Sequence, residues 1–422
     1  MSARPGASAR VPLPERAEVV VVGAGLAGLA AARTLHRVAR DVLVVEASDD
    51  VGGRVRTDVV DGFQLDRGFQ VLLTAYPEVR RQLDLPALDI QRFDPGALAW
   101  IDGQGHRVGD PFRRPGALLS TLRAPIGTPL DKVRILAART RVRRGSGADL
   151  LRGPDLTTIA SLREHGFSPR IIDRFFRPLF SGIQLDPALT TSSRMFDVIL
   201  RSMSEGDVGV PSAGMGAIPA QLAATLPGDR IVLDAAVAEV RPGEVQLVDG
   251  RRISADVIVV ATDGPRAAGL LGLRPVGSKA AGCVWFAADR APVPDKLVVL
   301  DSIGTGPVAN VAVLSNVAPS YAPAGQVLIA AALPGVSVGD LETVARAQLR
   351  GWWGPQVDGW RHLRTDRIAH GQPDGSPPFH PKKRVSLGEG LYVCGDHRDT
   401  GSIQGALFSG RRCGEAVAVA TA

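Results

Sequence analysis

The stretch from Glu18 to Thr57, EVVVVGAGLAGLAAARTLHRVARDVLVVEASDDVGGRVRT, decides the fold. Its β-branched run Val19–Val22 predicts a short buried strand, and the Ala- and Leu-rich segment Leu26–Val38 predicts a helix. A second strand is predicted over Val42–Val45. Strand, helix and strand in this order make the βαβ unit of nucleotide-binding sheets.

Three glycines, Gly23, Gly25 and Gly28, lie between the first strand and the helix with G-x-G-x-x-G spacing. Gly23 permits the sharp turn, Gly25 lets a pyrophosphate approach the backbone, and Gly28 allows the helix to pack closely on the strand. The N–H groups at the helix N-terminus then bind phosphate. Glu46, at the end of the second strand, is placed to accept hydrogen bonds from ribose hydroxyls. These residues together predict dinucleotide binding.

The acid is followed by Gly52-Gly53-Arg54-Val55-Arg56-Thr57. The ordered series G-x-G-x-x-G, E and G-G-R-x-x-T resembles the flavin amine oxidase, phytoene desaturase and protoporphyrinogen oxidase superfamily, whose members bind FAD. The resemblance implies that the cofactor is FAD. It adds Gly53 and Arg54 to the cofactor-binding residues and implies that Arg54 lies near the pyrophosphate or the flavin.

A second strand–turn–helix pattern lies near the C-terminus. Residues 390–396 read as a strand that runs into a Gly-Asp turn, and Gly401-Ser402-Ile403-Gln404-Gly405-Ala406 opens a helix. This pattern resembles the closing motif of the superfamily. The resemblance implies that Asp396 meets the ribityl chain or the pyrophosphate. It also implies that the N–H groups of Ile403 and Gln404 face the pyrimidine edge of the flavin, where the helix dipole stabilises negative charge.

The same resemblance implies three cofactor contacts elsewhere in the chain. An acidic-x-Gly segment beside the flavin corresponds here to Asp66 and Gly68, and the backbone that meets the adenine ring corresponds to Val237. A surface acid at a strand end is the alternative interpretation of Asp66. Any apolar residue at this position could make the adenine contact implied for Val237.

The expected fold class is α/β, with a Rossmann-like FAD-binding domain interleaved with an α+β substrate domain of antiparallel sheet plus helices. We assign residues 18–75, 210–266 and 361–422 to the FAD-binding domain. Residues 76–209 and 267–360 form the substrate-binding or cap domain. Residues 1–17, which contain Pro, Ala, Ser and Arg but no apolar core, are expected to be a disordered tail.

The candidate catalytic residues are His370, His397 and Arg398, because they are the polar groups expected near the flavin. Loop residues bonded to the backbone are the alternative. Flavin amine oxidases usually carry an aromatic residue beside the closing motif, whereas His397-Arg398-Asp399-Thr400-Gly401-Ser402 has none. The segment 367–373 also lacks one.

These departures favour an FAD-dependent oxidoreductase that moves a hydride between a substrate C–H bond and flavin N5. The expected substrate is apolar, of the phytoene desaturase or protoporphyrinogen oxidase type. One alternative is a flavin amine oxidase with a divergent aromatic cage. A second, from another class, is a membrane-surface binding protein that keeps FAD as a structural group.

Charge is concentrated in one region of this chain of 422 residues with formal net charge +6. Residues 107–144 are rich in Arg with interleaved apolar residues. We favour a solvated helix face; peripheral contact with an anionic membrane is the alternative. The region matches no nucleic-acid reader. Three cysteines without metal-ligand spacing, and no apolar run long enough for a membrane span, fit a cytoplasmic protein without a metal site.

Overall fold

The computed structural model describes residues 13–110 and 112–421, which divide into two compact units. The first unit comprises the chain up to Val55, Ile218–Val276, and the chain from Lys382 onward. The second comprises Arg56–Ala217 and Gly277–Pro381. Of the expected tail, residues 1–12 lie outside the described residues. Arg16 and Ala17 are not part of a tail but open strand β1, because they pair in parallel with Ser254 and Ala255.

The first unit is built on an eight-stranded sheet. Strand β1 lies at its centre, with β2 and β10 on one side and β13 on the other, and all of these pairs are parallel. On the side of β13 away from β1, its first half pairs with β12 in antiparallel orientation. Its second half pairs there with β20 in parallel orientation. The strands are β1 (Arg16–Val22), β2 (Val42–Val45), β10 (Ile231–Val232), β11 (Val237–Arg241), β12 (Glu244–Leu247), β13 (Arg252–Val260), β19 (Ser386–Gly388) and β20 (Leu391–Val393).

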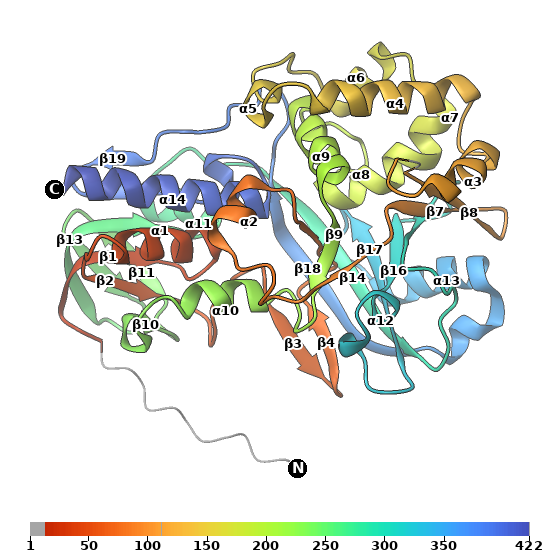
Figure 1. Cartoon of the computed structure of the whole chain (residues 1–422). Coiled ribbons are helices and arrows are strands. Elements are labelled where there is room, and N and C mark those ends of the chain that lie inside the picture. Colours follow the sequence, from red (N-terminus) through yellow and green to blue (C-terminus); the bar gives the residue numbers. More distant parts are fainter. Residues whose placement is uncertain (1–12, 111, 422) are drawn as a thin grey trace. The chain divides into compact units, whose positions relative to one another are not determined.

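Helices α1 (Leu26–His36) and α14 (Ile403–Ala420) pack against one another beside this sheet (Figure 1). Their close approach depends on Gly410, because a Cβ there would overlap the backbone of Ala27. The N- and C-terminal motifs are therefore carried by two neighbouring helices. The unit also contains α10 (Ala217–Ala223) and α11 (Gly264–Leu271).

The second unit contains a seven-stranded sheet with the order β18-β14-β17-β16-β15-β7-β8. We expected an antiparallel sheet, which is wrong for one pair of strands: β15 and β7 run parallel. The reason is that β7 precedes the helical region in the chain and joins the sheet beside β15. The strands are β7 (Gly96–Ile101), β8 (Gln104–Gly109), β14 (Ser278–Ala288), β15 (Val298–Asp301), β16 (Asn310–Val313), β17 (Val327–Pro334) and β18 (Arg361–Pro373). Helix α13 (Leu341–Trp353) contributes to the hydrophobic core on this sheet.

The remainder of the second unit is mostly helical, and α4 to α9 group together at the top of Figure 1. The helices are α2 (Pro77–Gln82), α3 (Leu118–Arg123), α4 (Pro129–Arg143), α5 (Gly147–Leu150), α6 (Thr158–Glu164), α7 (Pro169–Ile171), α8 (Arg177–Gln184), α9 (Ser193–Glu205) and α12 (Leu314–Val317). A π-helical turn precedes α8. The short strands are β3 (Thr57–Val60), β4 (Phe63–Asp66), β5 (Leu72–Leu73), β6 (Ile90–Arg92) and β9 (Val208–Pro211).

Three segments that we assigned to the FAD-binding domain, 56–75, 210–217 and 361–381, lie in the second unit, and residues 267–276, which we assigned to the cap domain, lie in the first. The physical reason is strand pairing. Strand β18 pairs with β14, β3 pairs with β4, and β5 pairs with β9, so each segment is hydrogen-bonded within that unit.

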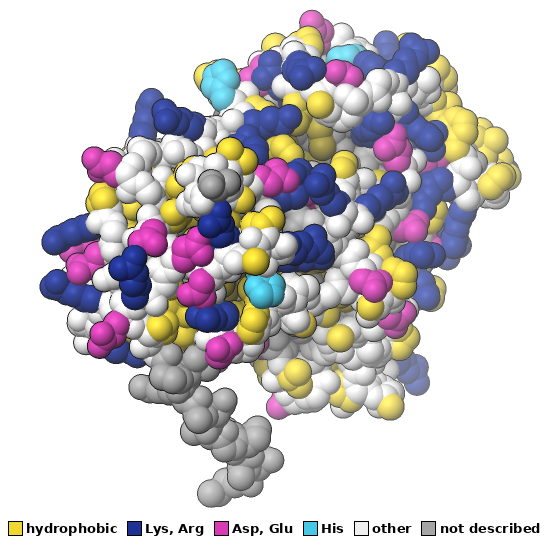
Figure 2. All heavy atoms as spheres, turned by 60° about the vertical axis from the view of Figure 1, so that its left-hand side comes forward, with side chains coloured by type: hydrophobic (Ala, Val, Ile, Leu, Met, Phe, Trp, Pro, Cys, Tyr) yellow, Lys and Arg dark blue, Asp and Glu magenta, His cyan; other side chains and the backbone are white. Residues whose placement is uncertain are grey.

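The described residues expose charge of both signs and bury their thiols. On the face drawn in Figure 2, Lys and Arg side chains alternate with Asp and Glu. Cys283, Cys394 and Cys413 are buried and unbonded to one another by disulfides. Within residues 13–110 and 112–421, no helix is long and apolar enough to cross a membrane.

Candidate FAD site

The turn between β1 and α1 is shaped by its glycines. Gly23 has a φ of 105°, in the region that favours glycine. A Cβ on Gly28 would overlap the Gly23 carbonyl oxygen, so the helix could not approach the strand with any other residue there. A Cβ on Gly25 would meet no heavy atom within 4 Å. Because no side chain caps α1 at Gly25, its N-terminus opens onto space that suits a phosphate.

The Gly52-Gly53-Arg54 loop folds directly against this turn. The Gly52 N–H donates to the Ala24 carbonyl oxygen at 2.8 Å, and Gly25 and Gly52 form an isolated parallel bridge. A Cβ on Gly53 would lie 3.6 Å from the Gly25 Cα. The two glycine motifs of the opening stretch therefore form one continuous backbone surface.

Glu46 is buried and bonded to the backbone of this same region. One carboxylate oxygen accepts the Ala24 N–H at 2.6 Å, and the other accepts the Ser48 N–H at 2.9 Å. A carboxylate oxygen has lone pairs for a second donor, so these bonds are compatible with ribose recognition. Glu46 therefore stabilises the glycine turn, a role that its sequence spacing from the glycine motif did not predict.

An ion pair joins the two ends of the chain. Arg54 Nη2 lies 2.8 Å from Asp396 Oδ1, and the Asp396 side chain is buried. Burial alone would lower the pKa of Arg54, but the Asp396 carboxylate raises it overall, so the guanidinium stays charged. Asp396 follows β20, and β20 is joined to β1 through the parallel strand β13. The sheet thereby brings Arg54 and Asp396 together across 342 positions of sequence.

Two further buried residues beside Asp396 carry polar atoms that have no hydrogen-bond partner among the described residues. Neither ring nitrogen of His397 is bonded, and one oxygen of Asp399 is unbonded. Burial lowers the pKa of His397 to about 4, so its imidazole is neutral at pH 7. Burial raises the pKa of Asp399. Buried polar atoms are normally paired, so these atoms indicate a site for a polar ligand.

Other predicted residues of the first unit occupy different settings. Arg398 donates to the backbone carbonyl of Arg384, which ties its guanidinium to the turn before β19. Ile403 and Gln404 open α14, and the Ser402 hydroxyl caps the N–H of Gly405 at 3.1 Å. The Val237 carbonyl accepts a bond from Arg266.

Asp66 lies in the second unit and is fully buried among protein groups. Its carboxylate accepts bonds from Thr57 Oγ1 at 2.6 Å, the Met215 N–H at 2.9 Å and Tyr321 OH at 3.0 Å. Burial raises its pKa to about 6 against the opposing effect of these bonds. Asp66 therefore anchors the end of β4.

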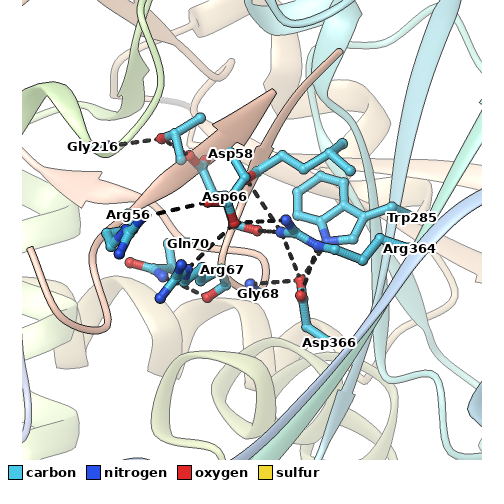
Figure 3. A network of polar contacts seen from close by, with 12 residues as sticks. Arg56, Asp58, Asp66, Arg67, Gly68, Gln70, Gly216, Trp285, Arg364 and Asp366 are labelled. Carbon is cyan, nitrogen blue, oxygen red and sulfur yellow. Dashed lines mark hydrogen bonds and ion pairs between the residues drawn. The ribbon is translucent and has the colours of Figure 1, made fainter. Parts of the chain in front are cut away.

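That backbone is held by residues that the sequence reasoning missed (Figure 3). Arg364 Nη2 donates to the Asp66 carbonyl oxygen at 2.7 Å, and the Gly68 N–H donates to Asp366 Oδ2 at 3.0 Å. Trp285 Nε1 donates to the same Asp366 oxygen at 2.7 Å. Gly68 has a φ of 80°, and a Cβ there would lie 2.8 Å from Ile368. The i, i+2 spacing of the two charged residues on β18 was the available signal.

The third catalytic candidate, His370, is also in the second unit. It is an exposed residue of β18, which is an edge strand of the seven-stranded sheet. Among the described residues, no group of three or more His, Cys, Asp or Glu side chains could hold a metal ion.

The first unit fits FAD on three observations. The space beside Gly25 allows a phosphate to approach the backbone, Arg54 supplies a positive charge next to it, and His397 and Asp399 hold unbonded polar atoms. A dinucleotide with a pyrophosphate and a polar ribityl chain matches this set of donors and acceptors.

A family model described as flavin containing amine oxidoreductase matches residues 26–418. The chain belongs to this family. The match runs from the first residue of α1 into α14, so it begins just after Gly25 and includes the Gly52-Gly53-Arg54 loop and the closing motif. Together with the glycine turn, family membership gives FAD as the cofactor.

Individual relatives match shorter segments. Putrescine oxidase from Kocuria rosea is 43% identical over 91 residues, which are 21% of this chain and 19% of that protein. L-amino-acid oxidase from Bothrops atrox is 35% identical over 105 residues, 24% of this chain and 21% of that protein. The matched segments therefore span about a fifth of the length of these curated relatives.

Solved structures match the fold over nearly the whole chain. A protein from Exiguobacterium sp. 255-15, provisionally assigned as protoporphyrinogen oxidase, has a TM-score of 0.71 at 18% identity, covering 96% of this chain and 99% of that one. Putrescine oxidase bound to putrescine has a TM-score of 0.70 at 16% identity, with coverage of 96% and 99%. At this identity the likeness shows the fold, which is an α/β FAD-binding architecture as the sequence predicted.

Proposed function

We propose that the protein is an FAD-dependent oxidoreductase that removes a hydride from a C–H bond of an apolar substrate, or carries out the reverse reaction. The observation that carries the proposal is the Arg54–Asp396 ion pair beside the open glycine turn. It unites the two strand–turn–helix motifs at one edge of one sheet, where an anionic dinucleotide is bound.

The roles of the chain's own groups follow from their contacts. The α1 N-terminus and Arg54 offset phosphate charge, while Glu46 keeps the glycine turn in shape. Ile403 and Gln404 sit at the N-terminal end of α14, whose dipole stabilises negative charge placed there. When bound, FAD supplies the hydride acceptor or donor. The backbone of Val237 remains our proposal for the adenine contact.

The histidine and arginine of the closing turn have positioning roles in this proposal. Because the pKa of His397 is lowered to about 4, its neutral imidazole can hold a polar atom but cannot serve as a cationic acid at pH 7. Arg398 is tied to the backbone of Arg384. His370 is exposed on β18, and it remains our candidate acid or base.

Asp66, Arg364 and Asp366 position the Gly68 backbone in this proposal. Arg364 donates to the Asp66 carbonyl and Asp366 accepts the Gly68 N–H, while the Asp66 carboxylate ties this segment to the chain by accepting the Met215 N–H. A backbone that is fixed in this way offers its N–H and C=O groups to a ligand without a free-energy cost for reorganisation. Gly68 supplies the contact to the flavin, and Asp66 acts through it.

The apolar substrate is supported by residue types around the closing turn. The stretch 397–402 contains no aromatic side chain, and neither does 367–373. An aromatic cage recognises a cationic amine through its π faces, so its absence disfavours amines. A divergent amine oxidase is the second candidate, because the family description and the putrescine oxidase match both refer to amines.

The test is anaerobic reduction of the purified FAD-loaded protein by two substrate panels. The proposal predicts that porphyrinogen- or polyene-type compounds bleach the flavin absorbance and that mono- and diamines do not. Bleaching by amines alone, with hydrogen peroxide formed after air is admitted, would support the amine oxidase instead. A flavin that neither panel nor dithionite reduces would indicate a protein that keeps FAD as a structural group.

A further inference from the structure

We propose that Phe112, α3 and the outward face of α4, together called the α3–α4 surface, dock onto the headgroup region of an anionic lipid bilayer. This inference concerns a partner of the second unit and is independent of the reaction proposed above. It rests on exposed apolar side chains, on contacts that join them into one surface, and on the charges that surround them.

Exposed apolar side chains are concentrated in this one region. Half of the large hydrophobic residues that the described chain exposes lie between positions 112 and 136. Phe112 is 60% exposed, Leu119 55% and Val133 59%. The full set is Phe112, Leu118, Leu119, Leu122, Leu130, Val133 and Leu136. Apolar residues exposed in such a concentration differ from the single, scattered ones that are normal on a protein surface, and they point to a binding surface.

Specific contacts hold these residues in one surface. Lys132 Nζ donates to the carbonyl oxygens of Leu122 and Ala124, which fastens the first turn of α4 to the end of α3. The Phe112 ring lies under the Arg139 guanidinium of α4, with 4.4 Å between Cζ and the ring centroid. The Thr121 hydroxyl accepts the Gly109 N–H at 2.9 Å and anchors α3 on β8. The apolar patch is therefore presented on a fixed support.

Helix α4 has two distinct faces. Its inward face buries Asp131, Ala138 and Val142. Leu130, Val133 and Leu136, which follow one another at three-residue spacing, lie on the exposed face. The exposed face of α4 therefore leaves three large apolar side chains in contact with solvent.

The charge of the region suits an anionic partner. Residues 107–144 contain ten Arg and Lys and two Asp, a net charge of +8, whereas the whole chain carries +6. Several of these arginines pair with acids of the second unit, such as Arg113 with Asp207 and Arg141 with Asp197. Three others are exposed and have no ion pair among the described residues; they are Arg123, Arg143 and Arg144. These cations are available for lipid phosphates.

The composition favours a bilayer over a protein partner. The core of a protein–protein interface is enriched in aromatic residues, whereas Phe112 is the one aromatic among the seven exposed apolar side chains here, and the other six are Leu or Val. Interfacial helices combine an apolar face with a basic rim. In Figure 2, hydrophobic side chains border Lys and Arg side chains at the upper right edge of the drawn face.

The experiment is vesicle flotation of the full FAD-loaded chain, with phosphatidylcholine vesicles that contain or lack phosphatidylglycerol. We expect the wild type to float with the anionic vesicles, and less so at high salt, because ions screen the electrostatic attraction. Leu119→Asp combined with Val133→Asp should lower the bound fraction at least tenfold. The matched control is Val59→Asp with Val338→Asp, which adds the same charge at positions 72% and 78% exposed and should float like the wild type.

A second pair of variants tests the charges. Arg123→Glu with Arg143→Glu should abolish the preference for phosphatidylglycerol, and Arg274→Glu with Arg290→Glu, which are also exposed, should keep it. All variants should retain the wild-type flavin spectrum and circular dichroism, because the changed side chains are exposed. The proposal is overturned if the wild type stays with the soluble fraction, or if the surface and control variants float equally. It is also overturned if Leu119→Asp with Val133→Asp dissociates a dimer while leaving flotation unchanged.

Discussion

Glu46 shows how one side chain serves two tasks that the sequence could reveal only in part. Its distance from the glycine motif predicted a ribose-binding acid, because that spacing follows from the length of one βαβ unit. Its bonds to the N–H groups of Ala24 and Ser48 depend on how the loop closes, and no spacing rule contains that information.

Glu46→Gln should weaken FAD binding about 10-fold to 100-fold, the loss expected when charge-assisted hydrogen bonds are replaced by neutral ones. Equilibrium titration of the FAD-free protein with FAD measures the change. Glu15→Gln, at an exposed position of the same unit, removes the same charge and should leave the affinity unchanged. Equal affinities for Glu46→Gln and the wild type would assign Glu46 no part in cofactor binding.

Asp66 gives the second unit a pH-dependent stability. Its pKa, raised by burial to about 6 from an unfolded value of 3.8, means that the folded protein holds a proton that the unfolded chain releases. The stabilising effect of that proton is complete below the unfolded pKa and is lost as the pH rises through the folded pKa. The loss amounts to about 3 kcal/mol in order of magnitude.

The variant Asp66→Asn should remove this pH dependence while also weakening the bonds from Thr57 and Tyr321. Between pH 4 and pH 7 the unfolding temperature of the wild type should therefore fall relative to that of the variant. Thermal unfolding followed by tryptophan fluorescence at both pH values measures the difference. A wild-type-minus-variant difference that does not change with pH would mean that Asp66 is ionised throughout.

At the scale of elements, the helices α1 and α14 depend on small residues where they cross. Gly410 faces the Ala27 backbone, and a Cβ at Gly414 would lie 2.8 Å from the Thr34 side chain. The sequence predicted both helices, because periodicity and glycine turns are local signals. It could not predict that they pack together, since their contact joins the two ends of the chain.

Gly410→Ala should destabilise the first unit by about 1–3 kcal/mol, the usual cost of overpacking. The matched substitution Gly269→Ala, in α11, places a Cβ where no atom lies within 4 Å. It should stabilise the protein by about 0.5–1 kcal/mol through the higher helix propensity of Ala. Denaturant unfolding measures the free energy of unfolding of both variants. Equal values for the two would show that α1 and α14 have room to separate.

Strands show the same division between local and long-range information. Strand β2 lies where a β-branched run predicted it. The assignment of β18 to the second unit could not be read from its own residues, because it follows from pairing with β14. The parallel pair of β7 and β15 was missed for the same reason.

In the whole molecule, the cofactor motifs lie near the ends of the chain, and we expect the middle of the chain to select the substrate. Dinucleotide chemistry dictates the glycine spacing, the terminal acid and the Gly-Asp turn, so these motifs could be recognised in the sequence. Arg364, Asp366 and Tyr321 could not be recognised, because each forms its hydrogen bond with a partner that is 298, 298 and 255 positions away in sequence, respectively.

Gly25→Ala tests the central claim, that the open turn between β1 and α1 exists to admit FAD. The added Cβ meets no protein atom within 4 Å, so the chain should fold with wild-type stability in the absence of cofactor. Because the methyl group would fill the space reserved for the phosphates, FAD affinity should fall at least tenfold, while Gly147→Ala, another substitution into open space, should bind FAD normally. The measurement is FAD content and affinity of the folded variants. Wild-type affinity in Gly25→Ala would contradict the account, because the cofactor would then lie elsewhere.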